Sequence, residues 1–323
     1  MTFDISAFKK LNILVVGDLM IDEYVWGDVD RISPEAPVPV VRVNRENFTL
    51  GGAGNVINNI VSMGACVSVI GTAGTGKTGK QLLTKLAELG VQIDGIVSEP
   101  YRPTTRKTRI IASSQQVLRI DRETKESVSP ETFDRILNLL KEKMGSADLV
   151  VISDYSKGLV TKELVASVSE LAKQNGIFCL ADPKGMDFSK YENVHILTPN
   201  RKETALASGM EINRIDDLIP AGEKILELAR LEKLLITCGK DGMLLLETDN
   251  PPFRIQSMAR QVFDVSGAGD TVISILGLCL AAGASFRRSA EVANAAAGIV
   301  VGKVGTATAT VEELAEALNS NPI

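Results

Sequence analysis

Short apolar runs alternate with helix-length segments over most of this 323-residue chain. The runs at 12–18, 148–153 and 177–182 are rich in Val, Ile and Leu, and each ends in polar residues. Continuous apolar runs of this length are typical of parallel strands that are buried on both faces. The segments between them have the length of helices, for example 129–144, which opens with the cap-like pair Ser-Pro. This alternation predicts an α/β fold, a doubly wound and mostly parallel sheet with helices on both faces.

Two stretches interrupt the alternation. Residues 23–46 contain three prolines, which disfavour a helix, and residues 95–122 contain short runs with alternating polar positions. Together they predict a small β-sheet beside the main one, which would serve as a lid or as an interface between subunits. The sequence shows no repeat and no linker, so we expect a single domain over residues 1–323 that carries both β inserts.

The composition limits the partners. With 35 Lys and Arg against 40 Asp and Glu, the formal net charge is −5, so neither nucleic acid nor an anionic membrane is an expected partner. The only histidine, His195, excludes a His-rich metal site. No apolar run reaches the ~20 residues that span a bilayer. The chain starts without an apolar signal segment, and its four cysteines are scattered, so we expect a soluble cytoplasmic protein.

The strongest local motif runs from Asp264 to Asp270, DVSGAGD, and precedes an apolar segment. Gly267, Ala268 and Gly269 are small, so backbone N–H groups at a helix start can approach an anion, and the helix dipole adds positive potential there. Asp270 would lie in the first turn beside that anion. This position suits a general base that deprotonates a hydroxyl while the amides stabilise a phosphoryl group in transfer. An ordinary helix start with a favourable aspartate fits the same residues.

Polar residues also end several apolar strands, where open α/β sheets bind ligands. These residues are Asp18, Asp154, Lys157, Asp182 and Lys184. Gly51 and Gly52 precede a helix and can bring backbone close to a polyol, while Asn55 offers both a donor and an acceptor. Several polar strand ends on one edge of the sheet favour a polar cleft over chance capping.

Two further motifs have alternative interpretations. Asn200 and Glu203 lie three positions apart, hence on one helix face. They would either contact magnesium-bound water on a nucleotide phosphate or form a capping box. Thr237, Gly239 and Gly242 surround a turn after an apolar strand, and this turn would be a simple hairpin or a loop over a nucleotide's phosphates.

The segment 71–78, GTAGTGKT, matches the P-loop pattern of nucleotide-binding proteins. A P-loop would leave the glycines near Asn55 and Asp270 without a role, and Gly79 is a poor residue for the first turn of the supporting helix. We therefore expect an ordinary turn with Lys77 at the surface, and a P-loop NTPase is the minor alternative.

Together these motifs resemble the ribokinase-like carbohydrate kinases. The two family signatures are Gly-Gly-x-x-Asn before an early helix and Asp-x-x-Gly-Ala-Gly-Asp near the end. Both are present, from Gly51 to Asn55 and from Asp264 to Asp270. Further motifs match in the same order at Asn200, Glu203, Thr237, Gly239 and Gly242. The resemblance covers essentially the whole chain.

The resemblance implies transfer of the γ-phosphoryl group of ATP to a sugar hydroxyl, with Mg²⁺ on the phosphates. Asp270 would be the base, and the amides of 267–269 would stabilise the transferring group. The implied sugar contacts come from Asp18, Gly51, Gly52, Asn55 and Asp154. The implied nucleotide contacts come from Asn200, Glu203, Thr237, Gly239, Gly242 and Asn294, with Asn200 and Glu203 reaching Mg²⁺ through water. A monovalent cation such as K⁺ would lie near the backbone of Asp264 and Ser266.

Within the family, segments 30–43 and 50–56 resemble kinases of D-glycero-β-D-manno-heptose 7-phosphate, which supply ADP-heptose synthesis for the lipopolysaccharide inner core. In many bacteria such a kinase is fused to an adenylyltransferase. One histidine cannot supply the histidine motif of that second half, so we expect a stand-alone kinase. Arg106, Lys107 and Lys157 would hold the phosphate of the sugar substrate.

The resemblance also implies a homodimer in which the β inserts pair between subunits and cover the sugar. Two other functions stay open as alternatives. One is a kinase of the same fold for another sugar phosphate or a nucleoside, and the other is a catalytically silent sensor.

Overall fold

The larger sheet follows the predicted alternation of strands and helices. The computed structural model describes residues 4–112, 115–259, 261–303 and 305–320, and within these ranges a nine-stranded sheet has the order β13-β12-β11-β10-β9-β8-β1-β4-β5. Its strands are β1 (Asn12–Gly17), β4 (Cys66–Gly74), β5 (Ile96–Glu99), β8 (Leu149–Ser153), β9 (Phe178–Asp182), β10 (Ile196–Leu197), β11 (Lys233–Thr237), β12 (Met243–Glu247) and β13 (Asn250–Ile255). All neighbours between β5 and β11 pair in parallel, whereas β12 and β13 are antiparallel. The predicted mostly parallel sheet is confirmed.

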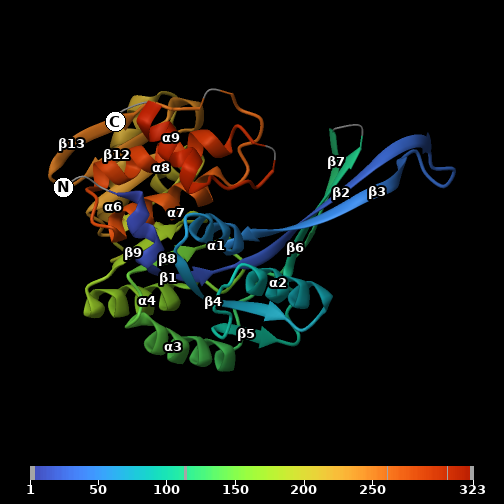
Figure 1. Cartoon of the computed structure of the whole chain (residues 1–323), viewed down its shortest axis with the longest axis horizontal. Helices are drawn as coiled ribbons and strands as arrows, with labels where there is room; N and C mark the ends of the chain where they lie inside the picture. Colours follow the sequence, from blue (N-terminus) through green and yellow to red (C-terminus); the bar gives the residue numbers. More distant parts are fainter. Residues whose placement is uncertain (1–3, 113–114, 260, 304, 321–323) are drawn as a thin grey trace.

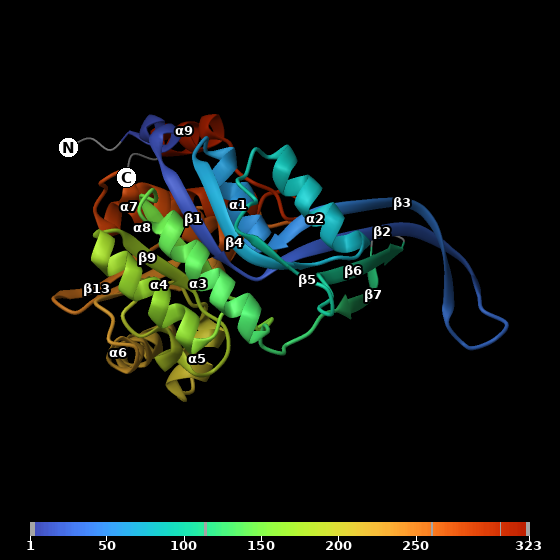
Figure 2. The ribbon, with the colours of Figure 1, turned by 90° about the horizontal axis from the view of Figure 1, so that it is seen from below.

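Helices cover both faces of this sheet, with α3 and α4 below it and α7 and α8 above it in Figure 1. Figure 2 shows α3 and α4 in front of the strands. The α-helices are α1 (Ala53–Ser62), α2 (Lys77–Glu88), α3 (Pro130–Met144), α4 (Lys162–Asn175), α5 (Arg201–Ser208), α6 (Leu218–Leu228), α7 (Ala268–Ala281), α8 (Phe286–Val300) and α9 (Val311–Ser320). Short 3₁₀ helices lie at Ile5–Lys10, Phe188–Tyr191, Ile215–Asp217 and Gly239–Asp241.

Alternate side chains of β1 enter two separate cores. Ile13 and Val15 pack with α1, α2, α7 and α8, whereas Leu14 and Val16 pack with α3, α4 and α6. Burial on both faces explains why the strands are apolar without alternation. The parallel pairing of the central strands brings their carboxyl ends, where the polar residues lie, to one edge of the sheet.

A second sheet of four strands projects from this body (Figures 1 and 2). Its order is β3-β2-β6-β7, with β2 (Leu19–Ile32), β3 (Pro39–Gly52), β6 (Thr105–Ala112) and β7 (Gln115–Arg122). The sheet begins at Leu19, closer to β1 than the predicted boundary at residue 23. The predicted boundary at residue 95 is too early, because Ile96 and Val97 are buried in the main body and β5 pairs with β4 there.

Most of the P-loop look-alike lies in regular secondary structure, with only residues 75 and 76 between β4 and α2. Residues 71–74 belong to β4 and pair with β5, and Lys77 is the exposed first residue of α2. A Cβ atom at Gly79 would lie 1.8 Å from the backbone oxygen of Gly74, so glycine is required where α2 crosses the end of β4. The close packing of a helix on a strand therefore explains this glycine.

Two smaller features concern the short strand β10 and the length of the helices. Only Ile196 and Leu197 of the segment 194–200 form a strand, β10, since Pro199 has no N–H for a strand ladder and Asn200 already caps α5. Within the described ranges, none of the helices combines the length and the apolar character that a bilayer crossing requires.

Candidate active site

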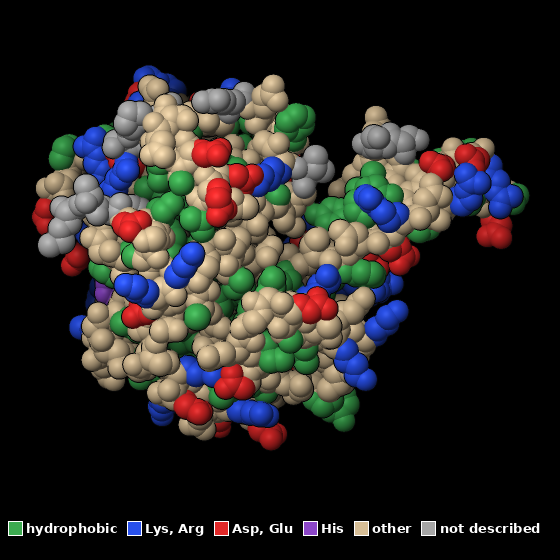
Figure 3. Space-filling view, viewed as in Figure 1, with side chains coloured by type: hydrophobic (Ala, Val, Ile, Leu, Met, Phe, Trp, Pro, Cys, Tyr) green, Lys and Arg blue, Asp and Glu red, His purple; other side chains and the backbone are tan. Residues whose placement is uncertain are grey.

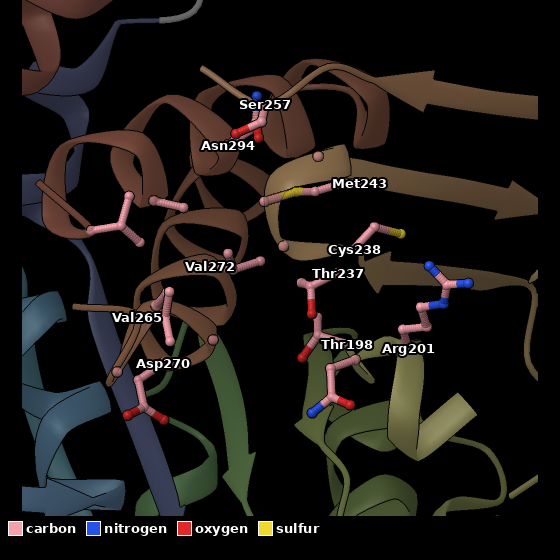
Figure 4. Close-up of a pocket in the computed structure, with 18 of the residues that line it drawn as sticks. Thr198, Arg201, Thr237, Cys238, Met243, Ser257, Val265, Asp270, Val272 and Asn294 are labelled. Atoms are coloured by element: carbon pink, nitrogen blue, oxygen red, sulfur yellow. The ribbon is translucent and has the colours of Figure 1, made fainter. Parts of the chain in front are cut away.

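A cavity of about 690 Å³ opens at the carboxyl ends of the central strands. It lies between the ends of β9 and β11, the start of α5, and the helices α7 and α8. Figure 4 shows Asp270 at one end of this cavity and Ser257 and Asn294 at the opposite end. The cavity is long enough to separate a reactive group at Asp270 from a recognition site near Asn294.

Asp270 is held by two hydrogen bonds from distant parts of the chain. Nδ2 of Asn55, in α1, donates to Oδ2 at 2.7 Å, and the hydroxyl of Tyr155, after β8, donates to Oδ1 at 2.8 Å. Burial raises the pKa of Asp270 to about 6, while these two hydrogen bonds and the charge of Lys184 act in the opposite direction. A carboxylate with this pKa can accept a proton near neutral pH.

The start of α7 provides amide groups beside Asp270. Gly267 has φ +80, and a Cβ there would lie 2.5 Å from Nδ2 of Asn55. The Ala268 amide donates to the Val265 carbonyl at 3.3 Å, so it is already engaged. The amides of Gly269 and Asp270 have no acceptor among the described residues, and nothing lies within 4 Å of a Cβ at Gly269. An anion can therefore approach this end of the helix.

All residues predicted to contact the nucleotide line the same cavity. They are Asn200, Glu203, Thr237, Gly239, Gly242 and Asn294. The two glycines have positive φ angles in the turn between β11 and β12. Nδ2 of Asn294 donates to the Gln256 carbonyl at 2.8 Å, which fixes the far end of the cavity.

Asn200 and Glu203 form the capping box that the sequence left as one interpretation. Oδ1 of Asn200 accepts from the Glu203 amide at 3.0 Å, and Oε2 of Glu203 accepts from the Asn200 amide at 2.9 Å. The other oxygen of Glu203 pairs with Lys184. The cap aims the Glu203 carboxylate at the cavity, so capping and a contact to a phosphate-bound cation are compatible.

Asp182 is a buried carboxylate on the cavity wall. It is 7% exposed, and its side chain has no hydrogen-bond partner among the described residues. Burial raises the pKa of Asp182 well above its usual range, and the charges of Asp270 and Glu203 act in the same direction. No cluster of three or more His, Cys, Asp or Glu in the described part of the chain could hold a metal ion. The carboxylates instead suit a hydrated Mg²⁺ that is held mainly by phosphate oxygens.

None of the residues predicted to contact the sugar, Asp18, Gly51, Gly52, Asn55 and Asp154, is among the residues that line the cavity. Oδ2 of Asp18 accepts from the backbone amides of Tyr155 and Lys157, at 2.8 and 3.0 Å, so it organises the turn after β8. Gly51 and Gly52 lie at the end of β3, where a Cβ would approach Asp22 and Asp18 to 2.3 and 2.6 Å. Of this group, Asn55 is the residue that contacts Asp270.

Asp154 is engaged inside the protein. It is fully buried, its Oδ1 accepts from the Ser156 amide at 2.6 Å, and its Oδ2 accepts from Lys190 and from the Tyr191 hydroxyl. Tyr191 in turn accepts from the Lys184 amide at 2.8 Å. The prediction of a sugar contact from Asp154 is therefore corrected, because its oxygens hold the backbone that carries Lys184.

The predicted phosphate-binding cations differ in their partners. Arg106 pairs with Glu23 at 3.6 Å, and Lys157 pairs with Glu123 at 2.8 Å. Lys107 forms no ion pair among the described residues, and its Nζ lies 5.7 Å from the centre of the Tyr155 ring. Of the three, Lys107 alone keeps its charge available for an anionic ligand.

Sequence reasoning missed Tyr155, which connects Asp270 to the cations. Asp154 and Lys157, which lie near it in the sequence, are predicted to bind the substrate because they carry charges. A signal was present, since Tyr155 follows an apolar strand on the same edge as the other polar residues.

Comparisons with known proteins identify a family for the chain. Residues 10–313 match the family model described as pfkB family carbohydrate kinase. A protein of Desulfatibacillum aliphaticivorans named bifunctional protein HldE is 53% identical over 322 residues, which cover 100% of this chain and 66% of that protein. The protein of the same name from Geobacter sulfurreducens is 46% identical, over 95% of this chain and 63% of that protein.

The chain thus spans about two thirds of the length of these curated relatives. The expectation of a kinase without a second catalytic half stays a prediction.

Solved structures share the fold at low sequence identity. Arabidopsis thaliana ribokinase complexed with ribose and ATP is 21% identical, with a TM-score of 0.76 over 95% of this chain and 98% of that chain. Escherichia coli phosphofructokinase-2 in complex with potassium is 20% identical, with a TM-score of 0.79 over 96% of this chain and 99% of that chain. The ribokinase-like fold is confirmed.

Proposed function

The chain belongs to the pfkB family of carbohydrate kinases and is a sugar kinase, and we propose that it phosphorylates the anomeric hydroxyl of D-glycero-β-D-manno-heptose 7-phosphate with ATP. The observation that carries the proposal is the buried Asp270 carboxylate beside the open amides of α7, at one end of the elongated cavity. The 1,7-bisphosphate product would enter ADP-heptose synthesis in the cytoplasm.

The reaction is an in-line displacement at the γ-phosphorus of ATP. Asp270 takes the proton of the anomeric hydroxyl as the new O–P bond forms and the bond to the β–γ bridging oxygen breaks, leaving ADP. The amides of Gly269 and Asp270 stabilise the charge on the transferring group. Asn55 keeps the carboxylate in a fixed orientation during proton transfer.

The nucleotide occupies the rest of the cavity. Asn200, Glu203 and Asp182 line the cavity where they would hold a hydrated Mg²⁺ on the phosphates, and Thr237 with Gly239 and Gly242 would lie along the phosphate chain. Mg²⁺ supplies charge neutralisation on the phosphate oxygens. The adenine end lies near Asn294. A monovalent cation such as K⁺ would lie at the backbone of Asp264 and Ser266.

Lys107 is the residue best suited to the 7-phosphate of the acceptor. Burial lowers the pKa of Lys107, and the charge of Lys157 acts in the same direction. A bound phosphate would supply the missing counter-charge, whereas Arg106 and Lys157 already have carboxylate partners. Because Lys107 lacks a carboxylate partner, it should favour a phosphorylated sugar over a neutral one.

We also propose that the small sheet pairs with that of a second copy. Figure 3 shows hydrophobic side chains on its projecting part. Val43, Val117 and Leu118 are 49%, 45% and 52% exposed, so the sheet has an apolar surface that no described residue covers. Light scattering at micromolar concentration should give the mass of a dimer.

A panel of acceptors in one ADP-release assay tests the proposed substrate. The panel contains heptose 7-phosphate, fructose 1-phosphate, fructose 6-phosphate, ribose and a nucleoside, each with ATP and Mg²⁺. We expect the highest kcat/KM with heptose 7-phosphate, and mass spectrometry should identify the 1,7-bisphosphate. Preference for another acceptor would refute the substrate assignment, and absence of any product would favour the sensor alternative.

A further inference from the structure

The hydroxyl of Tyr155 contacts the proposed base from the side opposite to Asn55. It donates to Oδ1 of Asp270 at 2.8 Å, and Asn55 donates to Oδ2 at 2.7 Å. We infer that Tyr155 is a positioning residue, whose hydrogen bond orients the Asp270 carboxylate and sets the pH at which the sugar hydroxyl is deprotonated. This inference rests on the proposed role of Asp270 as the base.

The two hydrogen bonds leave the carboxylate able to react. Each carboxylate oxygen can accept two hydrogen bonds, so an oxygen bonded to Tyr155 or Asn55 still has a lone pair for the acceptor hydroxyl. With one donor on each oxygen, the carboxylate cannot rotate without breaking a hydrogen bond. The free lone pairs therefore point in fixed directions before the sugar arrives.

The backbone delivers Tyr155 to this position. Oδ2 of Asp18 accepts from the Tyr155 amide at 2.8 Å, and Oδ1 of Asp154 accepts from the Ser156 amide at 2.6 Å. Ser156 has φ +53, which turns the chain sharply after β8. Two buried carboxylates thus stabilise the turn that points the tyrosine at Asp270, which gives Asp18 and Asp154 a shared task.

The surroundings of Tyr155 keep its hydroxyl a donor. Burial raises the pKa of Tyr155 well above its usual range, and the charge of Asp270 acts in the same direction. Lys107 and Lys184 lie 5.7 and 5.6 Å from the ring centre. The hydroxyl therefore retains its proton at neutral pH and donates to Asp270, with both cations near the ring.

The hydrogen bond from Tyr155 favours the charged form of Asp270. Other charges face the same carboxylate from different elements: Lys184 after β9 lowers its pKa, and Asp22 in β2 raises it. Asp182 at the end of β9 also lies near Asp270 and is itself influenced by it. Removing the Tyr155 hydroxyl leaves these charges in place, so the pKa of Asp270 should rise.

Tyr155→Phe tests the inference through the pH profile of kcat/KM for heptose 7-phosphate. We expect the acid limb of the profile, where kcat/KM falls as the pH is lowered, to move to higher pH by about one unit. This shift corresponds to a roughly tenfold loss of kcat/KM at pH values well below the limb and a smaller loss above it. Tyr155→Met, which fills the space with an unbranched apolar chain, should move the limb in the same direction. Tyr101→Phe removes a hydroxyl from a fully exposed tyrosine and should leave the limb unchanged.

A second measurement does not depend on turnover. Carboxyl ¹³C NMR of aspartate-labelled protein, with the Asp270 signal assigned by its loss in Asp270→Asn, gives the pKa of this group directly. We expect a higher value in Tyr155→Phe than in the unaltered protein. An equal loss of kcat/KM at every pH, with the same pKa of Asp270, would overturn the inference. Absence of kinase activity in the unaltered protein would instead reject the proposed function, and the NMR titration would still decide the role of Tyr155.

Discussion

The side-chain amide of Asn55 donates a 2.7 Å hydrogen bond to Asp270, although 215 positions separate the two residues. A second contact joins the same helices, since the Thr271 hydroxyl donates to Oδ1 of Asn59 at 2.8 Å. The two glycine-rich motifs at the starts of α1 and α7 therefore form one site. Neither motif is explained fully by helix capping, because each brings a side chain to the other.

Asp270→Asn should abolish phosphoryl transfer. The amide keeps the shape of the side chain but cannot accept a proton, so kcat should fall by at least ~10²–10⁴. ATP binding, measured by calorimetry, should change little because Asp270 lies at the opposite end of the cavity from Asn294. Asp249→Asn, at an exposed position in the β12–β13 turn, is the matched control with unchanged kcat. Near-normal ADP release by Asp270→Asn would contradict the mechanism.

The pH dependence of kcat/KM should follow the titration of Asp270. Burial raises the pKa of this group to about 6, and only the deprotonated carboxylate can act as the base. Activity should therefore be constant above this pH and fall about tenfold per unit below it. Initial rates between pH 5 and pH 9 at low sugar concentration measure this limb. If kcat/KM instead falls near pH 4, where aspartate ordinarily titrates, burial does not set the pKa of Asp270.

Lys107→Met should weaken binding of the phosphorylated acceptor. The loss of one charge-assisted contact corresponds to a rise in KM for heptose 7-phosphate of about 10- to 100-fold, with KM for ATP unchanged. KM for the unphosphorylated heptose should show almost no change. Lys80→Met, at an exposed position of α2, serves as the control. An equal effect on both sugars would mean that Lys107 does not contact the phosphate.

The sequence predicted those parts of the site that depend only on residues adjacent in the chain. Glycines before a helix and an aspartate in its first turn are local features of the sequence, so residues 267–270 could be proposed as an anion site without coordinates. Asp154 and Tyr155 are different, because both follow β8 and the strand period does not decide which of them faces the cavity. The turn at Ser156 decides it, and that turn depends on the distant Asp18.

The same limit applies to the small sheet. Its alternating polar positions and prolines predicted strands, but not that Ile96–Glu99 would join the larger sheet. That pairing depends on the burial of Ile96 and Val97 against the main body, which is a tertiary property.

Lys77→Ala and Gly79→Ala separate the P-loop alternative from the packing explanation. Lys77 is exposed at the start of α2, so its loss should leave ATP affinity and kcat within about twofold, since a surface substitution removes no buried contact. A methyl group at Gly79 would meet the Gly74 backbone at 1.8 Å, so it should lower the free energy of unfolding by ~1–3 kcal/mol. Chemical denaturation measures the second effect, and ATP titration measures the first. A collapse of ATP affinity in Lys77→Ala would place the phosphates at this segment, far from the amides of α7, and the kinase mechanism would lose its basis.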